Sequence, residues 1–223
     1  MDTNTSWPAA PAGDLRLQKI VLVVGRLGLA FVFFTQLWWK LPPTFGCTND
    51  FAFPRPAVQN YWDGNGSGGL CFWLGMETIY ASQPRKVLVS DMRPAGLPNA
   101  GIDIRPLAQV NAVLLENLVK PNIAFAGWLI WLAEFTVFVS LLLGLLTRLG
   151  GLLAIGVSLQ LYIGLANIPR PYEWEWSYGL LVLLSIVMFG LAPGRVFGID
   201  ARLRRHLATR AGSRFARFAS WIT

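Results

Sequence analysis

Apolar residues are gathered into four long runs separated by polar or Gly/Pro-rich connections. The runs cover about residues 18–39, 122–146, 149–168 and 176–192. A helix rises ~1.5 Å per residue, and about 20 apolar residues cross a hydrocarbon core of ~30 Å, so each run is predicted to be a transmembrane helix. Alternating ten-residue strands do not accompany the runs. The pattern therefore predicts an all-α bundle of four membrane helices.

The connections divide the rest of the chain. Residues 1–17 form a polar segment without a cleavage site after the first apolar run, so that run is expected to stay as an anchor. Residues 40–121 form a connection too long to be idle, and apolar residues near helical spacing predict a surface helix at about 107–119. Residues 122–192 hold the other three helices. Residues 193–223 form a basic tail.

Charge sets the expected orientation. The net charge is +7, and seven of the arginines lie in residues 193–223. Arg16 and Lys19 lie at the start of the first run, Arg148 separates the second and third, and the long connection is nearly neutral. Positive residues stay on the cytoplasmic side, so both termini are predicted to be cytoplasmic and residues 40–121 outside. The tail reads as a lipid-facing segment, and we expect no nucleic-acid binding.

Composition supports the membrane class and narrows the chemistry. The chain is 54% hydrophobic and 14% charged, against about 25% charged residues in soluble domains. His206 is the single histidine and falls in the basic tail, and Met188 is the only methionine inside a run. Haem, zinc and iron–sulfur centres need His, Met or Cys ligands in closer groups. We therefore expect no metal or haem held by this chain.

Cys47 and Cys71 are the only cysteines, and both fall in the predicted outside connection. An oxidising compartment favours a disulfide between them that closes the loop. A redox-active pair is less expected because the spacing is not C-x-x-C. Free thiols or a metal site are the remaining alternatives.

Two charges fall inside the predicted helices. Glu134 lies near the middle of the second run, where a carboxylate is unfavourable unless it is paired, protonated or facing a polar cavity. Arg26 lies early in the first run, at an axial offset of ~9 Å from Glu134 if the predicted depths hold. Two interpretations stay open: a buried ion pair that locks the helices, or a polar pocket for a quinone headgroup or a proton path.

Uncharged side chains would complete such a pocket. Gln36 and Gln160 lie in the first and third runs, where each also suits a helix–helix hydrogen bond. Trp176 belongs to an aromatic group at the predicted outer interface. An interfacial belt explains that group, and stacking on a quinone ring is the alternative.

Four short motifs resemble the DoxX/DoxD-like family of four-helix membrane proteins. Residues 26–31 read RLGLAF, 116–122 read ENLVKPN, 143–150 read LGLLTRLG and 193–200 read PGRVFGID. The resemblance implies a quinone-linked setting, because DoxD proteins are associated with thiosulfate:quinone oxidoreduction together with a second subunit. Carried over position by position, it marks Arg26, Glu134, Arg148 and Glu175 as candidate functional residues.

The leading hypothesis is an integral membrane subunit of a quinone-linked oxidoreductase in a prokaryotic inner membrane. In it, Arg26 and Glu134 are the catalytic candidates. The cofactor-binding candidates are Arg148, Gln36, Gln160, Glu175 and Trp176. The competing hypothesis is a non-catalytic accessory subunit of a larger respiratory or photosynthetic complex, whose outside loop docks on partner subunits. A docking loop should expose Trp62, Phe72 and Trp73, whereas an enzyme should bury them around a pocket. A transporter is disfavoured because no inverted repeat is evident.

Overall fold

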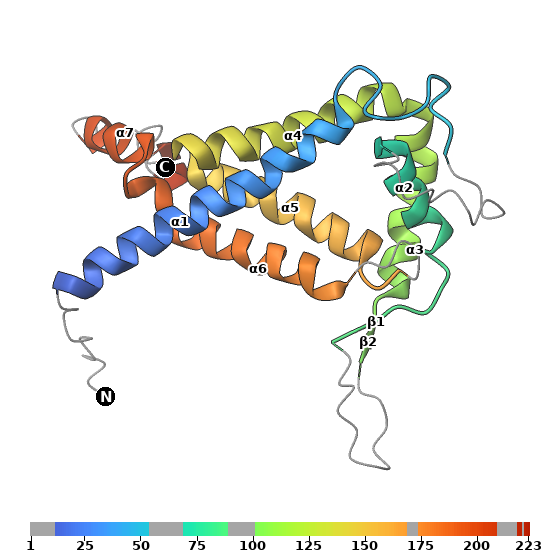
Figure 1. Cartoon of the computed structure of the whole chain (residues 1–223), viewed down its shortest axis with the longest axis horizontal. Coiled ribbons are helices and arrows are strands. Elements are labelled where there is room, and N and C mark those ends of the chain that lie inside the picture. The colour runs from blue at the N-terminus through green and yellow to red at the C-terminus, as the bar shows by residue number, and fades with distance from the viewer. Residues whose placement is uncertain (1–11, 54–68, 89–100, 169–173, 209–217, 220) are drawn as a thin grey trace, which may run out of the picture.

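Four long helices lie side by side at the centre of the protein. The computed structural model describes residues 12–53, 69–88, 101–168, 174–208, 218–219 and 221–223. The bundle consists of α1 (Ala12–Leu37), α4 (Ile123–Leu143), α5 (Thr147–Leu165) and α6 (Glu175–Leu191) (Figure 1). α4 packs against both α1 and α5, and α5 packs against α6. The all-α class predicted from the apolar runs is confirmed in its main part.

Three segments of the described chain are long and apolar enough to cross a membrane. They are Leu15–Lys40, Arg105–Leu143 and Thr147–Leu165. α6 is also apolar but has 17 residues, slightly fewer than the ~20 that span a hydrocarbon core. The structure therefore supports a membrane protein with three candidate spans, where the sequence predicted four.

A tight turn joins α4 to α5. Gly144 adopts a left-handed conformation (φ +63°), which glycine reaches without a Cβ penalty. The Ser140 hydroxyl donates to the Leu145 carbonyl at 2.7 Å and so pairs a carbonyl of the turn. α5 consequently begins at Thr147, two residues earlier than predicted, and ends at Leu165 instead of residue 168.

One end of the bundle carries α7 (Ile199–Ala208), which follows α6 after a short 3₁₀ turn. The start of α1 lies at this same end, so we call it the α7 end (Figure 1). The bundle core lies between the two ends, where Leu29, Phe33, Val137, Leu141 and Met188 pack together.

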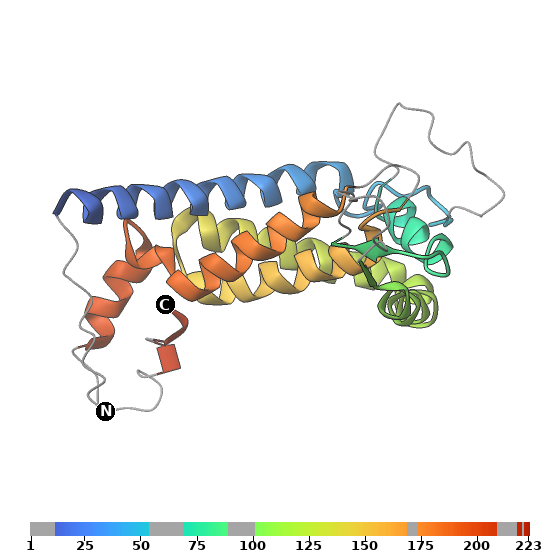
Figure 2. The same ribbon diagram turned by 90° about the horizontal axis from the view of Figure 1, so that it is seen from below.

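The opposite end carries a small cap. The cap consists of α2 (Gly69–Ile79), α3 (Arg105–Leu114) and a pair of two-residue strands, β1 (Lys86–Val87) and β2 (Ile102–Asp103). The strands are antiparallel, with Lys86 opposite Asp103. The views in Figures 1 and 2 show α3 lying across the end of the bundle, at a steep angle to α4.

The surface helix predicted at 107–119 is present but differently bounded. α3 ends at Leu114, a π-helical turn covers Leu115–Val119, and a 3₁₀ turn leads directly into α4. Ala108 and Ala112 face inward, whereas Leu107, Val110 and Leu114 are exposed. That exposed apolar face suits a helix lying on a membrane surface.

α2 and the strand pair were not predicted. Most of α2 is buried, including Leu70, Phe72 and Met76, so its sequence lacks the apolar stripe that marks an amphipathic helix. The predicted Cys47–Cys71 disulfide is confirmed, and it ties α2 to the segment that follows α1.

Candidate functional site

Buried charged residues of the described chain gather at the two ends of the bundle. Arg26 and Asp200 lie at the α7 end. The cap end holds Lys40, Glu77, Arg85, Glu134 and Glu175. A buried charge is unfavourable without a partner, so each of these residues is expected to have polar or charged partners nearby.

Asp200 closes the α7 end by accepting hydrogen bonds from the start of α5. Its carboxylate accepts from the Leu146 N–H at 2.7 Å, the Thr147 N–H at 2.9 Å and the Thr147 hydroxyl at 2.7 Å. The first N–H groups of a helix have no partner within the helix, and the helix dipole favours a negative charge there. Asp200 therefore caps α5 from another element.

Arg26 does not contact Glu134, so the predicted pairing is wrong. Its guanidinium donates to the carbonyls of Pro193, Val196 and Phe197, at 3.3–3.4 Å, in the connection between α6 and α7. Arg148 also lies at the α7 end, where it donates to the Trp221 carbonyl at 3.1 Å and lies over the Trp221 ring.

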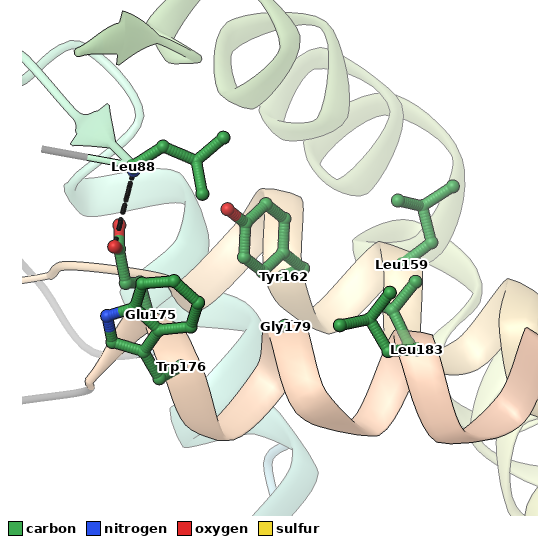
Figure 3. A pocket seen from close by; sticks show the side chains of 8 residues that line it. Leu88, Leu159, Tyr162, Glu175, Trp176, Gly179 and Leu183 are labelled. Carbon is green, nitrogen blue, oxygen red and sulfur yellow. Dashed lines mark hydrogen bonds between the residues drawn. The ribbon is translucent and has the colours of Figure 1, made fainter. Parts of the chain in front are cut away.

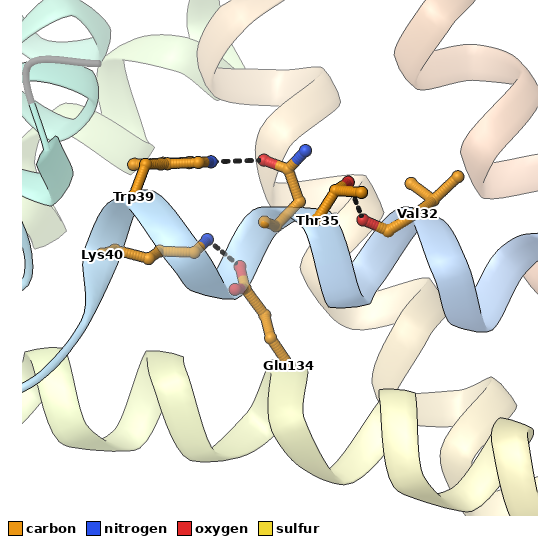
Figure 4. A network of polar contacts seen from close by, with 6 residues as sticks. Val32, Thr35, Trp39, Lys40 and Glu134 are labelled. Atoms are coloured by element: carbon orange, nitrogen blue, oxygen red, sulfur yellow. Dashed lines mark hydrogen bonds and ion pairs between the residues drawn. The ribbon is translucent and has the colours of Figure 1, made fainter. Parts of the chain in front are cut away.

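Glu134 pairs with Lys40 instead (Figure 4). Both side chains are buried, with 4% of the Glu134 side chain and 5% of the Lys40 side chain exposed. Lys40 follows Arg26 by fourteen residues along the same segment, a rise of ~21 Å. The register of α4 on α1 therefore places Glu134 beside the cap end of α1. The depths predicted from the sequence place it near Arg26 instead.

A tryptophan ring lies against the Lys40–Glu134 pair. The Lys40 ammonium lies 4.6 Å from the centre of a Trp39 ring, and Trp39 donates to Gln36 at 3.2 Å. The second Glu134 oxygen and the Trp131 indole nitrogen are buried without a hydrogen-bond partner among the described residues. Gln36 thus orients Trp39. In the Lys40–Glu134 pair, one Glu134 oxygen has no hydrogen-bond donor among the described residues.

Glu77 forms a separate network where α2, α3 and α5 meet. One of its oxygens accepts from Asn111 at 2.6 Å and from Gln160 at 2.7 Å. Gly164 makes room for it, because a Cβ at that position would collide with the carboxylate. Burial raises the pKa of Glu77 to about 7, although the two hydrogen bonds and the charge of Arg85 lower it.

Arg85 lies close to this network and caps the other end of α5. It donates to the Ile163 carbonyl at 2.8 Å and to the Gly164 carbonyl at 2.6 Å. Burial lowers its pKa, and the charge of Glu77 opposes that effect. Its Nε and second terminal nitrogen have no partner among the described residues.

A pocket of about 250 Å³ opens between α5, α6 and the end of β1 (Figure 3). Its apolar walls include Leu88, Leu159 and Leu183. Tyr162 and Glu175 supply its polar groups, and the Tyr162 hydroxyl points toward the end where Leu88 meets Glu175. Gly179 of α6 also lines the pocket, and a Cβ at this position would lie 3.6 Å from the Tyr162 ring.

Glu175 is held firmly at the polar end of the pocket. Its oxygens accept from the Leu88 N–H at 3.1 and 3.2 Å and from the Asn167 amide at 3.0 Å. It is also the first residue of α6, where a negative charge is favoured. The arrangement presents one buried carboxylate to an otherwise apolar space.

Two of the residues predicted to bind a cofactor, Glu175 and Trp176, line this pocket together. Gln160 belongs to the Glu77 network, Gln36 accepts from Trp39, and Arg148 lies at the α7 end, so these three do not join them. The binding roles remain predictions, as do the catalytic roles of Arg26 and Glu134.

Sequence reasoning missed Glu77, Arg85 and Tyr162. Glu77 directly follows an uncharged, mainly apolar stretch, residues 69–76, and a charge at that point was an available signal. Arg85 and Tyr162 gave none, because their partners come from distant parts of the chain. Within the described segments, no group of three His, Cys, Asp or Glu side chains could hold a metal ion.

Comparison with known protein families gave a match over most of the chain. The model of the family described as "TQO small subunit DoxD" matches residues 69–218, about two thirds of the 223 residues. The match begins at the first residue of α2 and continues past α7. No curated protein and no solved structure matches the chain.

Proposed function

The chain belongs to the DoxD family, and from this premise we propose that it is the membrane subunit of a thiosulfate:quinone oxidoreductase. We place the quinone headgroup in the pocket between α5 and α6. The observation that carries this proposal is one firmly held carboxylate, Glu175, at the end of an apolar pocket. Electrons would come from thiosulfate through a partner subunit.

The pocket suits a quinone headgroup in size and chemistry. Sites for drug-sized ligands occupy roughly 300–1,000 Å³, so a space of about 250 Å³ fits a single substituted ring. Leu159 and Leu183 line it and are exposed on the bundle surface. If α5 and α6 both cross the membrane, this rim faces lipid, which would accommodate an apolar tail.

The side chains of the pocket divide into two roles. The redox chemistry would come from the quinone, whose reduction takes up two electrons and two protons. Glu175 would accept a hydrogen bond from a hydroxyl of the reduced ring, because the Leu88 N–H and Asn167 hold its oxygens at the polar end. The Tyr162 hydroxyl offers a donor from the opposite wall. Trp176 offers an aromatic face beside Glu175.

We also infer that α6 is the fourth span. Its 17 residues rise ~26 Å, close to the ~30 Å of a hydrocarbon core. The start of α1 and α7 lie at the same end of the bundle (Figure 1), as an even number of crossings requires. With the basic α7 end cytoplasmic, the cap would lie outside an inner membrane.

The accessory-subunit hypothesis has less support. Of the residues expected to be exposed on a docking loop, Phe72 is buried and Trp73 is half-buried. Trp62 lies outside the described residues. Phe72 packs with Met76 and Leu165 where the cap meets α5, so it contributes to the fold.

A pocket-filling substitution tests the proposal. We expect Gly179→Leu to lower the quinone that co-purifies from native membranes by tenfold or more, because the side chain would occupy the pocket. Gly190→Leu is the matched control, because Gly190 lies on the same helix with open space around it. Quinone would be quantified per mole of folded protein. Equal quinone in the two variants would exclude this pocket.

A further inference from the structure

Glu77 is a buried carboxylate that the proposed quinone site does not use. It has 1% of its surface exposed and lies at the junction of α2, α3 and α5. The hydrogen bonds from Asn111 and Gln160 bring the cap and the bundle together on one atom of this side chain. Any change in the charge of Glu77 therefore acts directly on the contact between cap and bundle.

The charged groups around Glu77 leave it with one nearby cation. Arg85 interacts with it electrostatically without a direct ion pair. On α3, Arg105 pairs with Asp103 on the exposed side. On α5, Arg148 is at the far end and Tyr162 faces Glu175. Beyond the end of α1, Lys40 is already paired with Glu134.

Burial outweighs these favourable contacts, so the pKa of Glu77 is raised from 4.5 to about 7. When the cap is docked, Glu77 therefore keeps its proton to a higher pH than an exposed glutamate would. The preference for the docked state is present below the unperturbed pKa and is lost as pH rises from about 4.5 through about 7. Ionisation of Glu77 thus loosens the cap.

A short covalent path connects this network to the pocket. Arg85 runs directly into β1, and the next residue after β1 is Leu88. Leu88 lines the pocket, and its N–H holds Glu175. Arg85 is itself fixed on the carbonyls of Ile163 and Gly164, next to Tyr162. Movement of the cap would therefore displace one wall of the pocket.

We propose that Glu77 is a proton-binding site that regulates the α5–α6 pocket, holding the cap docked when protonated and releasing it when ionised. This inference rests on the proposed quinone site. Docking of the cap keeps Leu88 on Glu175 and the pocket wall in place. Quinone is therefore bound more tightly, and exchanges more slowly, on the acid side of neutrality.

Hydrogen–deuterium exchange of the full-length protein in lipid nanodiscs tests the cap directly. After correction for intrinsic exchange rates, we expect the α2 and α3 peptides to exchange about tenfold faster at pH 8 than at pH 6. Glu77→Gln keeps a neutral acceptor and should abolish this difference. Glu116→Gln is the control, because Glu116 is exposed just beyond α3 and should behave as wild type.

A second variant provides the test even if Glu77→Gln does not fold. Gln160→Met removes a hydrogen bond that favours the ionised carboxylate, so the midpoint of the pH response should move to higher pH. A pH response that is identical in wild type, Glu77→Gln and Gln160→Met would overturn the assignment. So would α2 and α3 exchange that does not change between pH 6 and pH 8 in wild type.

Quinone titration separates the two proposals. Binding of a short-chain ubiquinone to wild type should weaken from pH 6 to pH 8, and binding to Glu77→Gln should not. If the quinone binds with the same pH dependence in both, the regulatory inference is wrong and the pocket stands. If no quinone binds at any pH while the cap still responds through Glu77, the pocket assignment is wrong.

Discussion

The two ends of the bundle satisfy their buried charges in different ways. At the α7 end, Asp200 accepts two backbone N–H groups and Arg26 donates to three backbone carbonyls. At the cap end, Glu134 meets Lys40, and Glu77 meets Asn111 and Gln160. Arg85 and Glu175 at the cap end also bind main-chain groups. The difference therefore lies in Glu134 and Glu77, whose hydrogen-bond partners are all side chains.

This difference separates a fixed end from an adjustable one. Backbone partners at a helix terminus keep their positions as long as that terminus stays helical. Side-chain partners can rotate away or change protonation while the helices stay intact. Two of the motifs that resemble the family, residues 143–150 and 193–200, meet at the α7 end, where Thr147 binds Asp200. They hold the bundle together, and the pocket lies at the other end.

We expect the largest effect from breaking the Lys40–Glu134 pair at the cap end. Lys40→Met should lower the free energy of unfolding by about 3–5 kcal/mol, because it leaves Glu134 buried without its cation. The double variant Lys40→Met/Glu134→Leu should recover most of that loss. Thermal unfolding in detergent would measure both. If the double variant is no better than the single one, the pair is not the source of the stability.

At the α7 end, a smaller loss without rescue is expected. Asp200→Ala leaves the Leu146 and Thr147 donors without their acceptor and should lower stability by about 2–4 kcal/mol. Asp200→Asn keeps one acceptor oxygen, so its stability should lie between those of the wild type and Asp200→Ala. The same unfolding assay applies, with Asp50→Ala as a surface control. An unchanged melting temperature for Asp200→Ala would show that the cap of α5 is dispensable.

A still smaller effect sharpens the comparison within α5. Gly164→Ala inserts a methyl group against the Glu77 carboxylate and should destabilise by about 1–2 kcal/mol. Gly156→Ala on the same helix meets open space and should be neutral or stabilising, by up to about 1 kcal/mol. Differential scanning fluorimetry would rank the two. The reverse order would place Glu77 elsewhere than against α5.

Much of the fold was predictable, because apolar runs of this length have one low-energy solution in lipid. The segments that became α4, α5 and α6 were placed within three residues of their observed bounds, whereas α1 begins six residues before the predicted run. Cys47 and Cys71 were correctly paired. α2 escaped prediction because burial on most sides removed its periodicity. Helix ends also shifted where Gly144 turned the chain earlier than expected.

The candidate site was predictable only in part. Glu175 and Trp176 are adjacent in sequence at the start of one helix, so their joint presence at one pocket required no long-range information. Tyr162 joins them because α5 packs on α6. Arg26 and Glu134 were each identified as buried charges, and both are buried. Their pairing failed because depth from a membrane surface does not specify the register of one helix against another.

The sequence by itself determined the membrane class, the four long helices and the burial of Arg26 and Glu134, because these follow from local hydrophobicity and from the free energy of placing a charge in an apolar medium. The tertiary structure alone decided which charges meet. Lys40 opposite Glu134, Asp200 on the start of α5, and Glu77 against Gly164 each depend on interhelical register and on close backbone approach. Those quantities arise from packing among distant segments, which no local pattern encodes.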